Sequence, residues 1–97
     1  MKTTTSIDFK IQGLNESHTG SAAIIDLNST YPLGDLKQQA IDAHESENVT
    51  IRKIGSIWNA ELAQPGYEDN YDVYETYVDS GSDDYWYFAI NVGSREL

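Results

Sequence analysis

Polar and hydrophobic residues alternate near the start of the chain. Ile7, Phe9 and Ile11 occupy every second position of residues 6–12, with polar residues between them. This period places the apolar side chains on one face of an extended backbone, so it predicts a half-buried strand over residues 6–12. Apolar residues return in residues 21–27, which predict a second strand. The turn-forming residues between the two segments predict a β-hairpin.

The hydrophobic period then changes to that of a helix. Leu33, Leu36 and Ala40 fall on one helical face, and polar residues occupy the opposite face. The pattern predicts an amphipathic helix over residues 33–47. Asn48 is the expected left-handed residue at its carboxyl end.

Strand character returns in residues 49–62. Ile51 and Ile54 are three positions apart instead of two, so the apolar side chains change face between them. We therefore expect a β-bulge within residues 53–55. A short helix over residues 56–63 is the alternative for the second half of this segment.

The last two strands are predicted over residues 71–79 and 84–92. Gly81 and Ser82 suit a two-residue hairpin turn of type II′. That turn pairs Asp79 with Asp84, Tyr77 with Trp86, and Glu75 with Phe88.

The same register divides the side chains of this hairpin between two faces. The expected core face of the final strand carries Trp86, Phe88, Ile90 and Val92. The other face carries Tyr74, Tyr85 and Tyr87. Glu75 falls on the core face, where a carboxylate is unfavourable unless the strand lies at an edge or a bulge intervenes.

Together these segments predict a single α+β domain spanning residues 1–97. Its order is strand, strand, helix and three further strands, which favours a mostly antiparallel five-stranded sheet with the amphipathic helix packed on one face. One short helix cannot cover both faces of such a sheet. We therefore expect the second face to carry tyrosines and carboxylates in water.

The charge balance restricts the classes of partner. Sixteen Asp and Glu against six Lys and Arg give 97 residues a formal net charge of −10. This field repels nucleic acids and anionic membranes, attracts basic surfaces and keeps the free protein monomeric. No cysteine is present, and no apolar segment typical of a secretory signal or a membrane span follows the first residues. We therefore expect a cytoplasmic protein.

The acidic residues concentrate in one stretch. Residues 61–84 hold eight carboxylates and no lysine or arginine, with tyrosines threaded among them. Solubility explains excess acid, and β-propensity explains tyrosine, but like charges opposed across strands cost stability. Acids at a helix carboxyl end, such as Glu45 and Glu47, cost stability as well. Repeated local costs of one sign favour selection for the negative field itself. We predict a partner-binding surface formed by Glu68, Asp69, Asp72, Tyr74, Glu75, Asp79, Asp83, Asp84 and Tyr85.

Catalytic and metal chemistry are less well supported. Paired carboxylates act as acid and base only in separate environments within a cleft, and no nucleophile motif or glycine-rich phosphate loop occurs. We expect neither an enzyme nor a cofactor. Residues 79–84 resemble the start of a calcium loop, but Ile90 stands where an EF-hand needs glutamate. A calcium-dependent module remains a third class, and His18 and His44 have no ligand-like spacing.

Rows of carboxylates have a physical analogue in the phosphate backbone of DNA. Residues two apart on a strand lie about 6.7 Å apart on one face. Arginine binds carboxylate and phosphate with the same two-pronged geometry, and tyrosine stacks on guanidinium groups. These features favour a DNA mimic that occupies the DNA-binding groove of a basic, nucleic-acid-binding protein. The alternative is an acidic adaptor or immunity protein that neutralises a basic toxin or enzyme.

The length, the amphipathic helix over residues 33–47 and the acidic hairpin over residues 71–92 are similar to those of phage-encoded anti-CRISPR proteins. The chain resembles the small DNA-mimicking inhibitors of the type I-F surveillance complex. The resemblance implies an inhibitor in the bacterial host cytoplasm. It also implies that the protein blocks the site at which target DNA enters the CRISPR-Cas surveillance complex.

Overall fold

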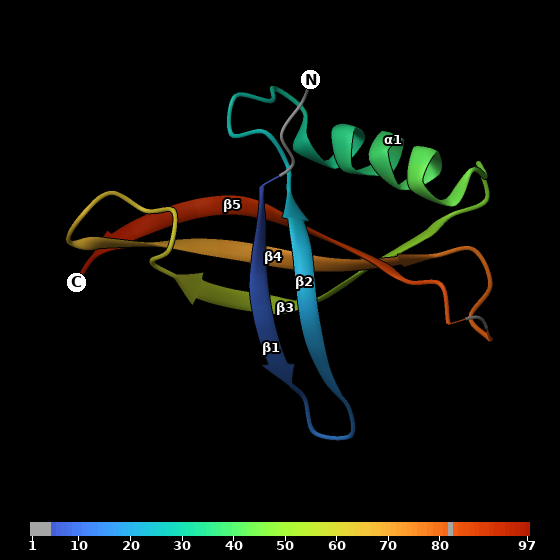
Figure 1. Cartoon of the computed structure of the whole chain (residues 1–97), viewed down its shortest axis with the longest axis horizontal. Coiled ribbons are helices and arrows are strands. Elements are labelled where there is room, and N and C mark those ends of the chain that lie inside the picture. The colour runs from blue at the N-terminus through green and yellow to red at the C-terminus, as the bar shows by residue number, and fades with distance from the viewer. Residues whose placement is uncertain (1–4, 82) are drawn as a thin grey trace.

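The computed structural model describes residues 5–81 and 83–97 and has one helix and five strands (Figure 1). The strands are β1 (Ser6–Gln12), β2 (Ser17–Ile24), β3 (Thr50–Asn59), β4 (Tyr67–Tyr77) and β5 (Trp86–Glu96), and the helix is α1 (Pro32–His44). The sequence-based prediction of an α+β fold is confirmed.

The strands form one mixed sheet in the order β1-β2-β5-β4-β3. Neighbours pair antiparallel except β2 and β5, which run parallel where Ala23 and Ile24 face Phe88 and Ala89. Parallel neighbours need a long crossover connection, and the segment holding α1, β3 and β4 supplies it. The sheet is therefore mostly antiparallel, as predicted, but not purely so.

The predicted amino-terminal hairpin is confirmed, with a different second strand. β2 starts at Ser17, opposite Gln12, and ends at Ile24 instead of residue 27. Its first residues are polar and lack the alternation that marks a strand. They are held in the strand by backbone pairing with β1, which the hydrophobic pattern does not record.

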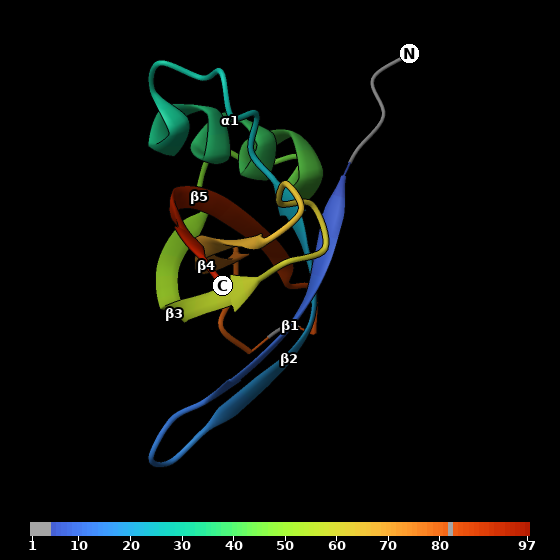
Figure 2. The same ribbon diagram turned by 90° about the vertical axis from the view of Figure 1, so that its left-hand side faces the viewer.

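This hairpin crosses the layer of β3, β4 and β5 at a steep angle (Figures 1 and 2). Its apolar residues Ile7, Phe9 and Ala22 pack with Tyr71, Val73 and Ala89 in a first hydrophobic core. The second face of the sheet is therefore buried beneath the hairpin. The prediction that it faces water is wrong, because a sheet bent in this way covers its own face.

A second core lies under α1. Leu36 and Ala40 of the helix pack with Ile25, Phe88 and Ile90. The helix thus packs on one face of the sheet, as its apolar stripe predicts.

The helix is shorter than predicted. It ends at His44, and Glu45 adopts the left-handed conformation (φ 54°, ψ 38°) while its N–H donates to the carbonyl of Ile41. Asn48 is not the cap. The side chain of His44, the last helical residue, is buried against β4.

β3 is a single strand, so the alternative helix over residues 56–63 is wrong. The predicted bulge between Lys53 and Gly55 is confirmed. Gly55 is required by a close approach, because a Cβ atom there would lie 2.8 Å from Cγ2 of Ile11 on β1. The bulge and the glycine together let β1 pack against β3.

The register of the last hairpin differs from the prediction by one residue. Thr76 faces Trp86, Glu75 faces Tyr87 and Tyr74 faces Phe88. The connection is longer than two residues, and the Asp79 side chain accepts the N–H of Gly81 within it. Ser82, part of the predicted turn, lies outside the described residues.

A slip of one residue exchanges the two faces of a strand. Tyr74 consequently lies with Phe88 on the helix side, and Glu75 lies with Tyr87 beneath the amino-terminal hairpin. Of the four residues expected in the core, Phe88 and Ile90 are buried, whereas Trp86 and Val92 are half exposed.

No helix in the described ranges 5–81 and 83–97 is long and apolar enough to cross a membrane.

Candidate partner-binding surface

Three of the four predicted acidic residues on β4 are paired with cations on neighbouring strands. Glu68 pairs with Arg95 of β5. The carboxylate of Asp72 lies 3.3 Å from Nζ of Lys53 and accepts a hydrogen bond from the Ser56 hydroxyl at 2.7 Å. Both carboxylates are therefore paired with cations within the sheet, although the sequence around them contains no lysine or arginine.

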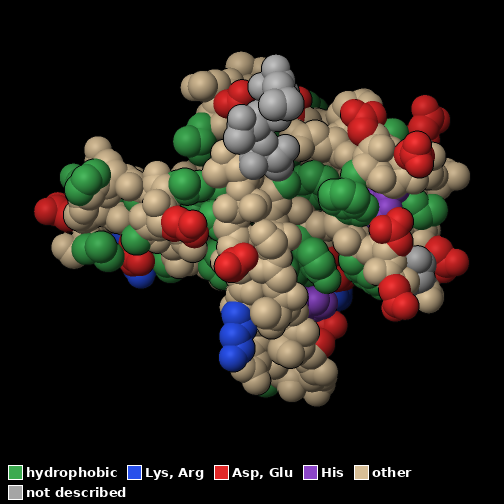
Figure 3. Space-filling model, in the orientation of Figure 1, with side chains coloured by type: hydrophobic (Ala, Val, Ile, Leu, Met, Phe, Trp, Pro, Cys, Tyr) green, Lys and Arg blue, Asp and Glu red, His purple; other side chains and the backbone are tan. Residues whose placement is uncertain are grey.

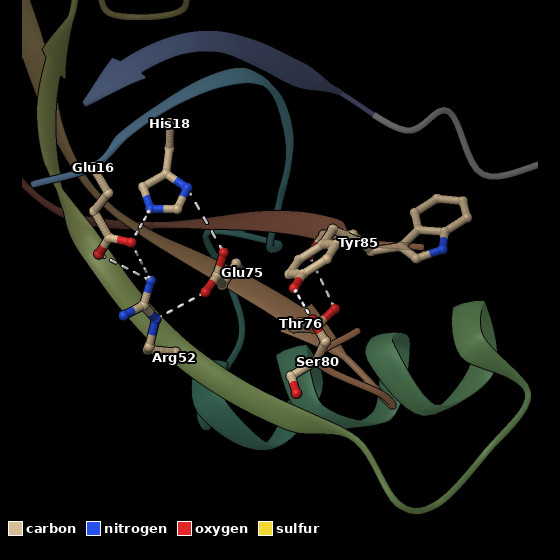
Figure 4. Close-up of polar contacts among 8 residues, drawn as sticks. Glu16, His18, Arg52, Glu75, Thr76, Ser80 and Tyr85 are labelled. Atoms are coloured by element: carbon tan, nitrogen blue, oxygen red, sulfur yellow. Dashed lines mark hydrogen bonds and ion pairs between the residues drawn. The ribbon is translucent and has the colours of Figure 1, made fainter. Parts of the chain in front are cut away.

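Glu75 is buried, with only 4% of its surface exposed. The Nε–H of Arg52 donates to it at 2.8 Å, and Nδ1 of His18 lies 3.7 Å from its other oxygen (Figure 4). Glu16 completes the group by binding Nη2 of Arg52 at 3.2 Å. Glu75 is thus a structural residue that joins the amino-terminal hairpin to β3 and β4, and it does not belong to the predicted partner-binding surface.

The electrostatics of this group favour the charged guanidinium. The hydrogen bond from Arg52 to Glu75, with the negative charge of that carboxylate, raises the pKa of Arg52 above its ordinary value. A permanently charged guanidinium is the usual partner of a buried carboxylate.

Five of the exposed carboxylates gather elsewhere, where the end of α1 meets the β4–β5 loop. We call this group the acidic pole and define it as Glu45, Glu47, Asp79, Asp83 and Asp84, all of which are exposed. Figure 3 shows red side chains at the right-hand end of the molecule, where Figure 1 places the end of α1 and this loop. The two segments that form the pole, residues 38–51 and 76–94, contain no lysine or arginine.

His44 joins the two halves of the pole. The Thr76 hydroxyl donates to the carbonyl of Trp86, so it must accept from Nε2 of His44, 3.0 Å away. The carbonyl of Thr76 accepts from the same nitrogen at 3.2 Å. Nε2 of His44 therefore carries a proton, and Nδ1 lies 3.7 Å from the carboxylate of Asp84.

The two predicted partner-binding tyrosines lie in different places. Tyr85 borders the pole, where its hydroxyl donates to the carbonyl of Ser80 (Figure 4). Its ring lies 5.2 Å from that of Tyr77. Tyr74 packs against the helix-side core. Only Tyr85 can offer a ring edge beside the pole.

Two further tyrosines are held within the protein. Burial raises the pKa of Tyr71, and the neighbouring charge of Asp69 raises it further. Burial also raises the pKa of Tyr87, with a smaller contribution from Glu75.

The structure thus brings together Asp79, Asp83, Asp84 and Tyr85 of the predicted set, and it adds Glu45 and Glu47. The sequence signal for the added pair is their unfavourable position at a helix carboxyl end. Asp69 lies apart from both groups, in a groove beside α1.

No group of three His, Cys, Asp or Glu side chains that could hold a metal ion occurs within residues 5–81 and 83–97. Comparisons of the chain with protein-family models, with curated proteins and with solved structures found no match.

Proposed function

We propose that this protein inhibits a bacterial DNA-binding defence complex of the CRISPR-Cas type. It acts as an anti-CRISPR protein and DNA mimic that places its acidic pole in the site for target DNA. The type I-F surveillance complex, in the bacterial host cytoplasm, is the partner to test first. The protein contributes no catalysis and no cofactor, and it binds no nucleic acid itself.

One observation carries this proposal: lysine or arginine partners lie beside Glu68, Asp72 and Glu75 on the strands, whereas the two segments that form the pole contain neither residue type. Glu68, Asp72 and Glu75 each have a lysine or arginine partner. The pole has five exposed carboxylates on two segments that lack both residue types. Lysine and arginine side chains that grip phosphates bind carboxylates with the same hydrogen bonds.

The pole is also costly to maintain. A carboxylate at a helix carboxyl end is unfavourable by about 0.3–1 kcal/mol. The left-handed conformation costs a residue with a side chain roughly 1–2 kcal/mol more than glycine, and Glu45 occupies it. Strained and like-charged arrangements of this kind concentrate at functional sites.

Two neutralised variants with equal changes of charge test the proposal. The pole variant is Glu45→Gln, Glu47→Gln, Asp79→Asn and Asp83→Asn. The control variant is Asp8→Asn, Asp35→Asn, Glu61→Gln and Glu96→Gln, all exposed and all outside the pole.

Binding to the purified, guide-loaded type I-F complex is measured by biolayer interferometry at fixed salt. We expect the pole variant to lose more than tenfold in affinity, which is about 1.4 kcal/mol, while the control stays within threefold. Equal losses in both variants would mean that only net charge matters and would refute the assignment of the pole.

A further inference from the structure

A groove of about 760 Å³ lies on a different part of the surface from the acidic pole. It is enclosed by the end of β2 and the loop that follows, by α1, by the loop after β3 and by β4. A volume of this size can hold one large side chain and its neighbours, since pockets for small molecules span about 300–1,000 Å³.

Three carboxylates from three separate elements line the groove: Asp26, Asp42 and Asp69. Asp26 accepts the backbone N–H of Asn28 at 2.8 Å, and Asp42 accepts the side-chain amide of Gln38 at 3.1 Å. The hydroxyl of the buried Tyr71 donates to Asp69 at 3.4 Å. Each carboxylate is therefore oriented by a neutral donor.

None of the three forms an ion pair with a lysine or arginine of the described chain, in contrast to Glu68 and Asp72 on the same strand as Asp69. Three oriented carboxylates around one cavity produce a negative potential that low-dielectric walls concentrate. The groove therefore favours a bound cation, and no lysine or arginine within residues 5–81 and 83–97 pairs with its carboxylates.

Apolar side chains line the groove together with the carboxylates. Leu27 and Leu62 are exposed, at 68% and 48%, and both line the groove beside Ile24 and Tyr71. An occupant must therefore combine a positive head with apolar surface. An arginine side chain has this character, because its methylene stem packs on apolar atoms and its planar guanidinium offers five donors to carboxylates.

We propose that this groove binds a partner protein through an arginine flanked by apolar residues. The guanidinium is attracted to the carboxylates that line the groove, Asp26, Asp42 and Asp69, and the flanking side chains cover Leu27 and Leu62. This contact is independent of the acidic pole, so it holds or fails whether or not the pole imitates DNA.

The probes are two capped peptides, acetyl-Leu-Arg-Leu-amide and acetyl-Leu-Gln-Leu-amide, titrated into the ¹⁵N-labelled full chain and followed by NMR. We expect the arginine peptide to shift the amide signals of Leu27, Leu62 and Tyr71. The glutamine peptide should bind at least tenfold more weakly. Equal binding of both peptides, or shifts confined to the pole, would overturn the proposal.

Matched variants separate the groove from general attraction between charges. Asp26→Asn with Asp42→Asn and Asp69→Asn should reduce binding of the arginine peptide at least tenfold. Glu47→Gln with Asp79→Asn and Asp83→Asn removes the same charge at the pole and should change it less than twofold. If the groove triple variant does not fold, Asp26→Asn alone, in an exposed loop, should still weaken binding threefold or more. No loss in that variant refutes the site.

Discussion

Removing the guanidinium of Arg52 should destabilise the protein far more than removing the neighbouring lysine. Arg52→Ala leaves the carboxylate of Glu75 buried without its main partner. Breaking a fully buried ion pair costs about 3–5 kcal/mol, whereas an exposed pair contributes about 0–1 kcal/mol.

The free energy contributed by the Arg52–Glu75 pair should lie between those two limits. The side chain of Glu75 is only 6% exposed but that of Arg52 is 46% exposed, so water screens the cation more than the anion. We therefore expect a loss of about 2 kcal/mol. For a domain of this size the loss lowers Tm by roughly 8–16 °C.

Lys53→Ala is the matched control. Lys53 is similarly exposed, at 50%. Its partner Asp72 is 18% exposed, so it keeps the hydrogen bond from Ser56 and more contact with water than Glu75. Its removal should cost less than about 1 kcal/mol. Both are measured by urea unfolding followed by circular dichroism, with thermal melts alongside.

A double variant tests the cause. Arg52→Met with Glu75→Leu removes both charges and should recover most of the stability that Arg52→Ala loses, because no unpaired buried charge remains. Equal losses in Arg52→Ala and Lys53→Ala would refute this account of Glu75. No recovery in the double variant would refute it as well.

Two further predictions concern the tyrosines and the end of the helix. Burial holds the pKa of Tyr71 and Tyr87 above the ordinary value of about 10, so the unfolded chain loses these protons first. The stability that this pKa difference provides is complete below about pH 10 and is lost as pH rises through the folded pKa values. The double variant Tyr71→Phe with Tyr87→Phe should therefore flatten a plot of Tm against pH from about 9 to 11. A tyrosinate absorbance titration of the folded protein that matches the unfolded chain would contradict it. Glu45→Gly should raise stability by about 1 kcal/mol, because glycine accepts the left-handed conformation and the change removes a carboxylate from the helix end. The same change should weaken binding to the surveillance complex, and an unchanged or lower Tm would show that Glu45 is not strained.

The sequence predicted the elements better than it predicted their register. The helical stripe and the slip between Ile51 and Ile54 are local patterns, and both led to correct predictions. The register of the last hairpin was predicted wrongly because Gly81 and Ser82 favoured a two-residue turn, whereas the structure has a longer loop. One residue of slip was enough to exchange the faces of Tyr74 and Glu75.

The amino-terminal hairpin covers the second face of the sheet, and Glu75 is buried beneath it. No local sequence pattern shows the cause of either feature. Both depend on β2 lying beside β5, which brings the amino-terminal hairpin across the sheet. Arg52 and Glu75 are 23 residues apart in sequence and meet only because β3 pairs with β4 across a bulge. For the same reason the acidic stretch of the sequence is divided in the structure between balanced strands and the acidic pole.

The central claim is that this protein and DNA compete for the same site on the partner. Labelled target DNA is incubated with the guide-loaded type I-F complex at low salt, and the protein is added up to saturation while fluorescence anisotropy is recorded. We expect complete displacement of the DNA, with an apparent affinity for the protein that falls in proportion to DNA concentration. A ternary complex of protein, surveillance complex and target DNA at full occupancy would contradict DNA mimicry.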